Sequence, residues 1–156
     1  MLINFVCVGS KMPAWVNQAY SEYEKRLNKD VKLRLAEIDG IKRTKSMSVE
    51  KIKAKEAANI QKLVSKRTHV VVLDVKGKAW STEELALRLA CWLHSGKEVS
   101  LIVGGPDGLD DEILSRADEL WSLSKLTFPH PIVRVVVAEQ IYRAWSVLNN
   151  HPYHRM

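Results

Sequence analysis

Residues 69–75 read HVVVLDV, and residues 99–109 read VSLIVGGPDGL. The runs VVVL and SLIV are continuously apolar, which is typical of strands that helices cover on both faces. Two earlier β-rich runs occupy Leu2–Val8 and Val31–Ile38. Because longer segments with helical spacing separate these runs, we predict an α/β fold: a mostly parallel sheet with helices on both faces and right-handed crossovers.

Five segments carry apolar residues at helical spacing. The third begins with the residues STEE at 81–84, which predicts a helix cap followed by acidic residues in the first turn. The last segment, Ile132–Leu148, is apolar nearly all round, which predicts that it is buried on more than one side. A second subunit is one candidate for the surface that buries it. The five segments are Pro13–Leu27, Ser48–Lys66, Thr82–Leu93, Asp107–Ala117 and Ile132–Leu148.

Length and composition indicate a globular chain of one domain, residues 1–156. Apolar residues make up 46% and charged residues 27%, which excludes a disordered chain. Cys7 and Cys91 lie in apolar runs without CxxC spacing, so we expect buried reduced thiols and no metal site. No run is long enough to span a membrane, and no basic region precedes the apolar opening. We therefore expect a cytoplasmic protein without membrane contact.

Positive charge is concentrated in residues 41–67. This segment holds nine basic and two acidic residues, a net charge of +7 within a chain whose total is +6. Such clustering indicates a surface for a polyanion such as RNA, although most charge runs are ordinary solvated helix faces. Composition leaves both interpretations open. The candidate RNA contacts are Lys42, Arg43, Lys45, Lys51, Lys53 and Lys55.

Two motifs follow predicted strands, where parallel α/β sheets bind ligands. The first is GGPDGL at 104–109, whose glycines permit either a close backbone approach to a ligand or merely a sharp turn. The second is WSLSKLTFPHP at 121–131, which can offer backbone groups and an apolar pocket, or form only a short strand and a stiff loop. His130 is also a candidate cap of the following helix, with Pro131 at its first position.

Polar residues in the last helix and in the tail are the remaining candidates. Glu139 and Arg143 are four residues apart, so they either pair with each other or leave Arg143 for a site. The tail, residues 149–156, reads NNHPYHRM and gathers groups that transfer protons, stack on bases and bind phosphate. Because a proline follows the helix, we expect the tail to leave the helix direction.

The chain resembles the ribosomal RNA large subunit methyltransferase H family from end to end. The similarity lies in KMPAWV, EYEKRL, LDVKGKAWS, SLIVGGPDGL, LSKLTFPHPIVRVVVAEQIYRAWS and NHPYHR. Members are small SPOUT-class enzymes that methylate N3 of a pseudouridine in 23S rRNA. The resemblance implies a C-terminal trefoil knot, a knotted cofactor-binding region at about residues 99–148, and a homodimer in which the tail of one chain completes the site of the other.

The resemblance also assigns site residues. It implies S-adenosylmethionine as methyl donor, without a metal, held by Leu73, Gly104, Leu123, Ser124, Lys125, Leu126, Thr127 and Phe128. For the chemistry we hypothesise His154 as base, Tyr153 as the group that orients the acceptor, and Arg155 or Arg143 as the positive charge. Spacing does not separate His154 from His151 or His130 as the base. The alternatives are a non-catalytic RNA-binding module and a knotted methyltransferase that acts on tRNA.

Overall fold

The computed structural model describes residues 1–27 and 29–155. Within them five strands form one parallel sheet in the order β2-β1-β4-β3-β5. The four predicted strands are confirmed, and β5 adds a short fifth at the sheet edge. Their bounds are β1 Leu2–Val8, β2 Lys32–Ile38, β3 His69–Ala79, β4 Val99–Val103 and β5 Glu119–Ser122.

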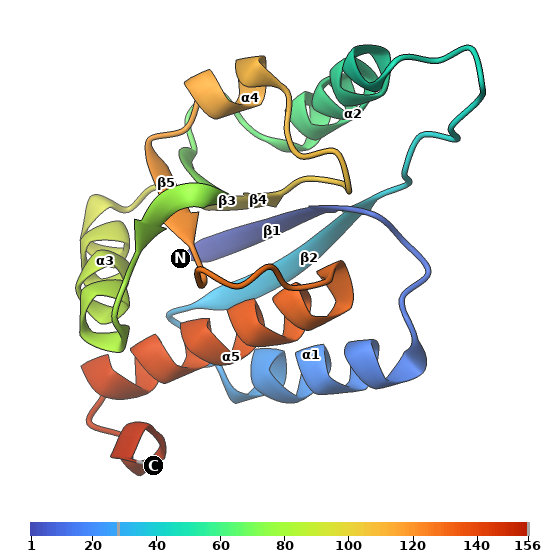
Figure 1. Cartoon of the computed structure of the whole chain (residues 1–156). Coiled ribbons are helices and arrows are strands. Elements are labelled where there is room, and N and C mark those ends of the chain that lie inside the picture. Colours follow the sequence, from blue (N-terminus) through green and yellow to red (C-terminus); the bar gives the residue numbers. More distant parts are fainter. Residues whose placement is uncertain (28, 156) are drawn as a thin grey trace.

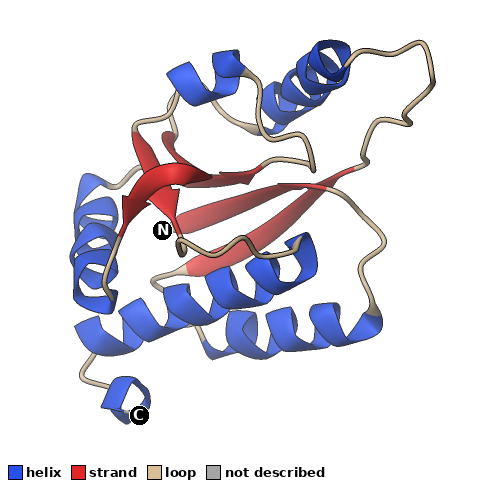
Figure 2. Cartoon of the chain, viewed as in Figure 1, coloured by secondary structure: helices blue, strands red, loops and turns tan. Residues whose placement is uncertain are grey.

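Helices cover both faces of the sheet, as predicted (Figures 1 and 2). Helices α1, α3 and α5 pack on one face, while α2 and α4 pack on the other. The tail forms a short 3-10 helix, η1, beyond the end of α5 (Figure 1). The helices are α1 Ala14–Arg26, α2 Val49–Leu63, α3 Thr82–Ser95, α4 Asp111–Ser115, α5 His130–Leu148 and η1 Pro152–Arg155.

Successive side chains of the central strands point into different cores. Phe5 and Leu101 pack with α1, α3 and α5, whereas Val6 and Ile102 pack with α2 and α4. All four side chains are buried. A strand whose two faces are both covered carries mainly apolar residues on both, which explains the nearly continuous runs VVVL and SLIV.

Strand β3 is longer than predicted because of one glycine. The predicted strand ended at Val75, but β3 continues to Ala79, with an irregularity in its pairing to β5 between Leu73 and Lys78. A Cβ on Gly77 would lie 2.7 Å from backbone atoms of Leu120 and Trp121. Only a residue without a side chain lets the two backbones approach this closely.

Capping residues mark the starts of three helices, α2, α3 and α4. Ser81 and Glu84 form the predicted capping box at the start of α3, and the Ser48 hydroxyl caps α2 by accepting from the Lys51 N–H. Helix α4 begins only at Asp111, capped by Asp110, because residues 105–108 form a turn. Val49 and Leu63 are apolar residues of α2 that are 45% and 41% exposed, because they lie at the two ends of the helix.

The two cysteines differ. Cys7 is buried in β1, and burial raises the pKa of its thiol to about 12, although Arg134 nearby acts to lower it. Cys91 is exposed, so the prediction of a buried thiol is wrong there. Helix α3 turns Leu89 and Trp92 inward and leaves Cys91 and Leu87 on its outer side.

Candidate active site

The carboxyl ends of β4 and β5 and residues 73–75 at the bend of β3 surround a cavity of about 510 Å³. Its walls come from the strand ends, from the turn at 105–108, from the loop between β5 and α5, and from the first turn of α5. Seven of the eight predicted cofactor contacts line it: Leu73, Gly104, Leu123, Ser124, Leu126, Thr127 and Phe128. Lys125 lies on the same loop but is not among the described residues that line the cavity.

The turn after β4 is formed by GPDG at 105–108. The Gly108 N–H donates to the Gly105 carbonyl at 3.0 Å, Pro106 occupies the second position, and Gly108 has a φ of +81°. A Cβ on Gly104 would lie 2.7 Å from Cγ of Leu109. The glycine at 104 is therefore required by the packing of its own loop, whatever occupies the cavity.

The loop between β5 and α5 is held by its own serines. The Ser122 hydroxyl donates to the Ser124 carbonyl at 3.0 Å, and the Leu126 N–H donates to the Ser124 hydroxyl at 3.0 Å. Leu126 is 70% exposed although it lines the cavity. An apolar side chain is thus held at the cavity rim, where a ligand can cover it.

His130 forms part of the cavity wall at the start of α5. Burial lowers the pKa of its imidazole, and the charge of Arg134 lowers it further. Its Nδ1 is buried without a hydrogen-bond partner among the described residues. The alternative that His130 caps the helix is wrong: Pro129 is the capping residue, His130 is the first helical residue, and no side chain caps this end.

Arg134 anchors the same end of α5 to the sheet. Its side chain is 1% exposed and donates to Glu37 Oε2 and to the Gly9 carbonyl, both at 2.6 Å. In the sequence Arg134 is a charged residue inside the nearly all-apolar segment Ile132–Leu148, and this pattern assigns it no role. No local signal could identify Glu37, which lies 97 residues away in the chain and reaches Arg134 only through β2.

Two carboxylates that sequence reasoning did not single out also line the cavity. Asp74 follows Leu73 at the bend of β3, where it accepts from the Lys76 N–H at 2.8 Å, and Asp107 lies in the turn after β4. Their only signal in the sequence was position: Asp74 is the one charged residue near the end of the predicted strand 69–75, and Asp107 lies in the glycine motif that follows the next strand. They give the mainly apolar cavity an anionic component.

Glu139 joins two of the predicted catalytic residues near the far end of α5. Its Oε1 accepts from Nε of Arg143 at 2.9 Å and from the Tyr153 hydroxyl at 3.0 Å. Burial raises the pKa of Tyr153, as do hydrogen bonds to Tyr23 and Glu139, so the phenol is a neutral donor at neutral pH. The predicted pairing of Glu139 with Arg143 is confirmed, and Tyr153 joins it.

The rest of the tail packs beside this group. The His151 ring lies 6.2 Å from the Tyr142 ring, and its Nδ1 accepts from the Tyr153 N–H at 3.3 Å. His154 is half-buried and Arg155 is exposed. The chain leaves the direction of α5 after Leu148, as expected, and folds back onto the helix through Tyr153. Met156 lies outside the described residues.

Glu139, Arg143 and the tail residues His151–Arg155 are called the tail group below. Helix α5 separates the cavity from this tail group. The helix has 19 residues, so its ends are about 27 Å apart at 1.5 Å per residue. His130 lies in the cavity wall at one end, while Tyr153 and His154 follow the other end (Figure 1). Within one chain the structure therefore does not bring the predicted catalytic residues to the predicted cofactor contacts.

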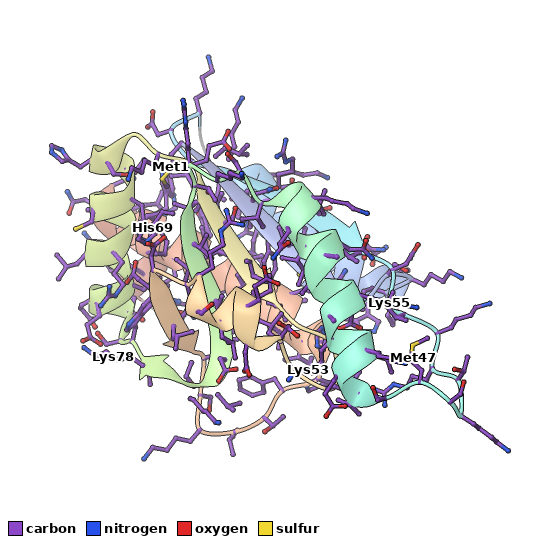
Figure 3. All side chains as sticks on the ribbon, turned by 90° about the horizontal axis from the view of Figure 1, so that it is seen from above. Met1, Met47, Lys53, Lys55, His69 and Lys78 are labelled. Atoms are coloured by element: carbon purple, nitrogen blue, oxygen red, sulfur yellow. The ribbon has the colours of Figure 1, made fainter. Side chains whose placement is uncertain are left out.

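The predicted RNA contacts lie on the loop after β2 and on α2. Lys42, Arg43 and Lys45 are exposed on the loop, but Arg43 pairs with Asp107 of the cavity turn. Lys51 and Lys55 are four residues apart and share one side of α2, whereas Lys53 points elsewhere. Figure 3 labels Lys53 and Lys55 on this helix, with Met47 on the loop before it. The six residues thus do not form a single face.

The residues that the structure describes contain no group of three or more His, Cys, Asp or Glu placed to hold a metal ion. Among the helices formed by those residues, none has the length and apolar character needed to cross a membrane.

Comparison with known proteins assigns the family. Residues 1–154 match the family model described as "Predicted SPOUT methyltransferase". The chain belongs to the SPOUT methyltransferase family. Its relatives include the ribosomal RNA large subunit methyltransferases H of Methylococcus capsulatus, 55% identical over 99% of this chain and 100% of the relative, and of Hydrogenovibrio crunogenus, 55% identical over 99% of both chains. The corresponding protein of Thioalkalivibrio sulfidiphilus is 52% identical over 99% of both.

The fold of SPOUT methyltransferases is also found among solved structures. A probable methylase family protein from Haemophilus influenzae Rd KW20 superposes with a TM-score of 0.58 at 15% identity, covering 96% of this chain and 69% of that one. A methylase family protein from Neisseria gonorrhoeae gives a TM-score of 0.51 at 14% identity, covering 90% and 81%. At these identities the likeness concerns the fold alone. The cavity at the ends of β4 and β5 and the bend of β3 is thus the candidate active site of a SPOUT-class methyltransferase.

Proposed function

We propose that this methyltransferase transfers the methyl group of S-adenosylmethionine to N3 of a pseudouridine in 23S rRNA of the large ribosomal subunit. The observation that carries the proposal is the cavity at the carboxyl ends of β4 and β5 and the bend of β3, in a chain whose full-length relatives bear the name of rRNA large subunit methyltransferases. Such enzymes act where ribosomes are made, so we place the protein in the cytoplasm.

The cavity suits this methyl donor in size and charge. Its volume of about 510 Å³ is within the range of small-molecule sites, and apolar residues such as Leu73 and Phe128 supply much of its lining. S-adenosylmethionine carries a sulfonium and an ammonium group, and Asp74 supplies a carboxylate that complements positive charge, whereas the Asp107 carboxylate is paired with Arg43. Leu126 at the rim helps to exclude water, which methyl transfer from a sulfonium requires.

A second copy of the chain resolves the separation between the cavity and the tail. Ile132, Val135 and Val136 lie along one side of α5 and are only half-buried in the single chain. Pairing two copies through this side covers apolar surface, and lets the tail of one chain reach the cavity of its partner. We therefore propose a homodimer with composite sites, together with a C-terminal trefoil knot within residues 99–148.

The tail group supplies the acid–base chemistry in this scheme. The sulfur–methyl bond breaks as the methyl carbon bonds to N3, and the N3 proton must go to a base. His154 is the proposed base, with His151 and His130 as alternatives. Arg143 or Arg155 stabilises the negative charge on the pseudouridine. Tyr153, whose hydroxyl donates to Glu139, orients the pseudouridine ring. Lysines of residues 41–67 bind the rRNA phosphates.

Methyl transfer measured on parallel substrates tests the proposal. Protein with tritiated S-adenosylmethionine is offered intact ribosomes, separated large and small subunits, and tRNA, and cofactor binding is measured by calorimetry. We expect cofactor binding and transfer into 23S rRNA. Cofactor binding with transfer into tRNA alone would assign a different substrate, and a failure to bind the cofactor would indicate a non-catalytic RNA-binding module.

A further inference from the structure

The loop between β2 and α2 reaches the turn that lines the cavity. Nη2 of Arg43, on this loop, lies 2.5 Å from Oδ2 of Asp107, which is 64 residues away in the chain. The Asp107 side chain is 18% exposed and lines the cavity, whereas the Arg43 side chain is 54% exposed. One ion pair therefore joins the basic segment to the candidate cofactor site.

Glu56 packs against the turn that carries Asp107. It lies on α2, is 5% exposed, and its carboxylate oxygens lie 3.2 Å from the position that a Cβ on Gly105 would take. Burial raises the pKa of Glu56, as does the negative charge of Asp107, while the Ile41 backbone N–H and the charge of Arg43 act to lower it. Arg43 thus forms an ion pair with Asp107 of the turn, and its charge also acts on Glu56, which packs against the turn at Gly105.

The neighbouring lysines lack such a link. Lys42 and Lys45 are exposed on the same loop, and in the described part of the chain neither has a carboxylate oxygen within ion-pair distance. Arg43 is not among the described residues that line the cavity, so it acts on the cavity only through Asp107. Its guanidinium has five donors, and its exposed part leaves donors free for an RNA phosphate while Asp107 is held.

We propose that Arg43 is a positioning residue that couples RNA binding to the cofactor site. Its pair with Asp107 holds the turn at 105–108 in place, and a phosphate that binds the exposed part of Arg43 immobilises the guanidinium and so orders the turn further. RNA and cofactor then strengthen each other's binding by the same factor, because coupling between two sites is reciprocal. This inference rests on the proposed function for the identity of both ligands.

The first test needs neither ligand. Amide hydrogen exchange is measured at residues 104–109 of the free protein for the wild type, Arg43→Gln and Arg43→Lys, with Lys45→Gln as the matched loss of one charge from the same loop. We expect exchange about fivefold faster in Arg43→Gln, unchanged exchange in Lys45→Gln, and substantial rescue in Arg43→Lys, which keeps the ion pair. Wild-type exchange in Arg43→Gln would overturn the proposal, even if the protein bound no cofactor at all.

The second test measures the coupling itself. The probe is S-adenosylhomocysteine, the demethylated product, which cannot react, and its Kd is measured by calorimetry with and without isolated large subunits. For the wild type we expect the subunits to tighten binding about fivefold, at the lower end of typical coupling. In Arg43→Gln binding should be weaker without subunits and should not respond to them, while Lys45→Gln should keep the wild-type affinity without subunits. An equal response in Arg43→Gln and the wild type would refute the coupling, whereas a wild type without any cofactor affinity would instead refute the proposed function.

Discussion

The two ends of α5 are built differently. At the cavity end, Arg134 is 1% exposed and donates to Glu37, near the end of β2, and to the carbonyl of Gly9, directly after β1. At the tail end, Arg143 is 22% exposed, and its partner Glu139 is a residue of the same helix. The first arginine is part of the core, and the second belongs to a polar group that solvent or a partner can reach. The cavity end of α5 is thus fixed to the sheet of its own chain, while the polar group at the tail end consists of residues of α5 and of the tail that bond to each other.

Removing the tail should have the largest effect. Deletion of residues 151–156 removes the groups proposed to handle the proton and charge of the acceptor, so we expect methyl transfer to fall about 1000-fold. Cofactor affinity should persist because the cavity lies at the other end of α5. Single-turnover transfer to large subunits and calorimetry measure the two quantities. Full activity in the truncated protein would remove the tail from catalysis.

Complementation tests whether the tail acts across a dimer. A full-length chain carrying Gly104→Val has a damaged cavity, since a side chain at 104 collides with Leu109. Mixed with the truncated chain, it should form one composite site with an intact cavity and an intact tail, and activity should return. The folding of each inactive parent and the exchange of subunits are verified separately. No rescue in a verified heterodimer would place each tail in the site of its own chain.

Matched arginine substitutions sharpen the comparison between the two ends. Arg134→Gln removes a guanidinium that is 1% exposed and takes the partner away from the Gly9 carbonyl and from Glu37, whose side chain is 36% exposed, so it should lower the free energy of unfolding by about 2 kcal/mol. Arg143→Gln removes a partly exposed pair and should lower it by less than about 1 kcal/mol, yet reduce methyl transfer strongly. Urea denaturation and single-turnover rates measure both. Equal losses of stability would contradict the distinction between a core arginine and a site arginine.

A glycine substitution in the cavity turn should have a smaller effect. Gly104→Ala places a Cβ 2.7 Å from Cγ of Leu109, so we expect a loss of about 2 kcal/mol from overpacking, together with weaker cofactor binding. Gly40→Ala is the control, because no atom lies within 4 Å of its Cβ position, and its stability should hardly change. Thermal unfolding and calorimetry measure these effects. Similar behaviour of the two variants would show that the turn can move aside.

The smallest effect concerns pH. Burial and the charge of Arg134 lower the pKa of His130 in the folded chain below its ordinary value of 6.5. Below pH 6.5, His130 therefore binds a proton in the unfolded chain more readily than in the folded chain, which favours unfolding. His130 thus does not reduce the free energy of unfolding above pH 6.5, and it reduces this free energy increasingly as the pH falls below 6.5. Between about pH 7.5 and about pH 5 the Tm of the wild type should fall more than that of His130→Gln. Parallel pH profiles would show that His130 titrates normally.

Local chemistry predicted the elements and the cavity loops well. The runs VVVL and SLIV, the Ser81–Glu84 cap and the turn at 105–108 each depend on neighbours within a few residues, and each is found as expected. Prediction was weaker where a distant neighbour decides the outcome. The exposure of Cys91 depends on which side of α3 meets the sheet, and the end of β3 depends on the close approach of β5 to Gly77.

The sequence by itself determined the class of fold, the motifs at the strand ends and the family, because periodicity, caps, turn glycines and motif strings are all local properties of the chain. Tertiary structure alone decided that β4 lies between β1 and β3, that Arg134 pairs with Glu37, and that Arg43 holds Asp107. It also decided that the tail and the cavity of one chain lie at opposite ends of α5. The physical reason is that these contacts join residues tens of positions apart, and which of them meet depends on how the strands and helices pack as a whole rather than on any short-range pattern.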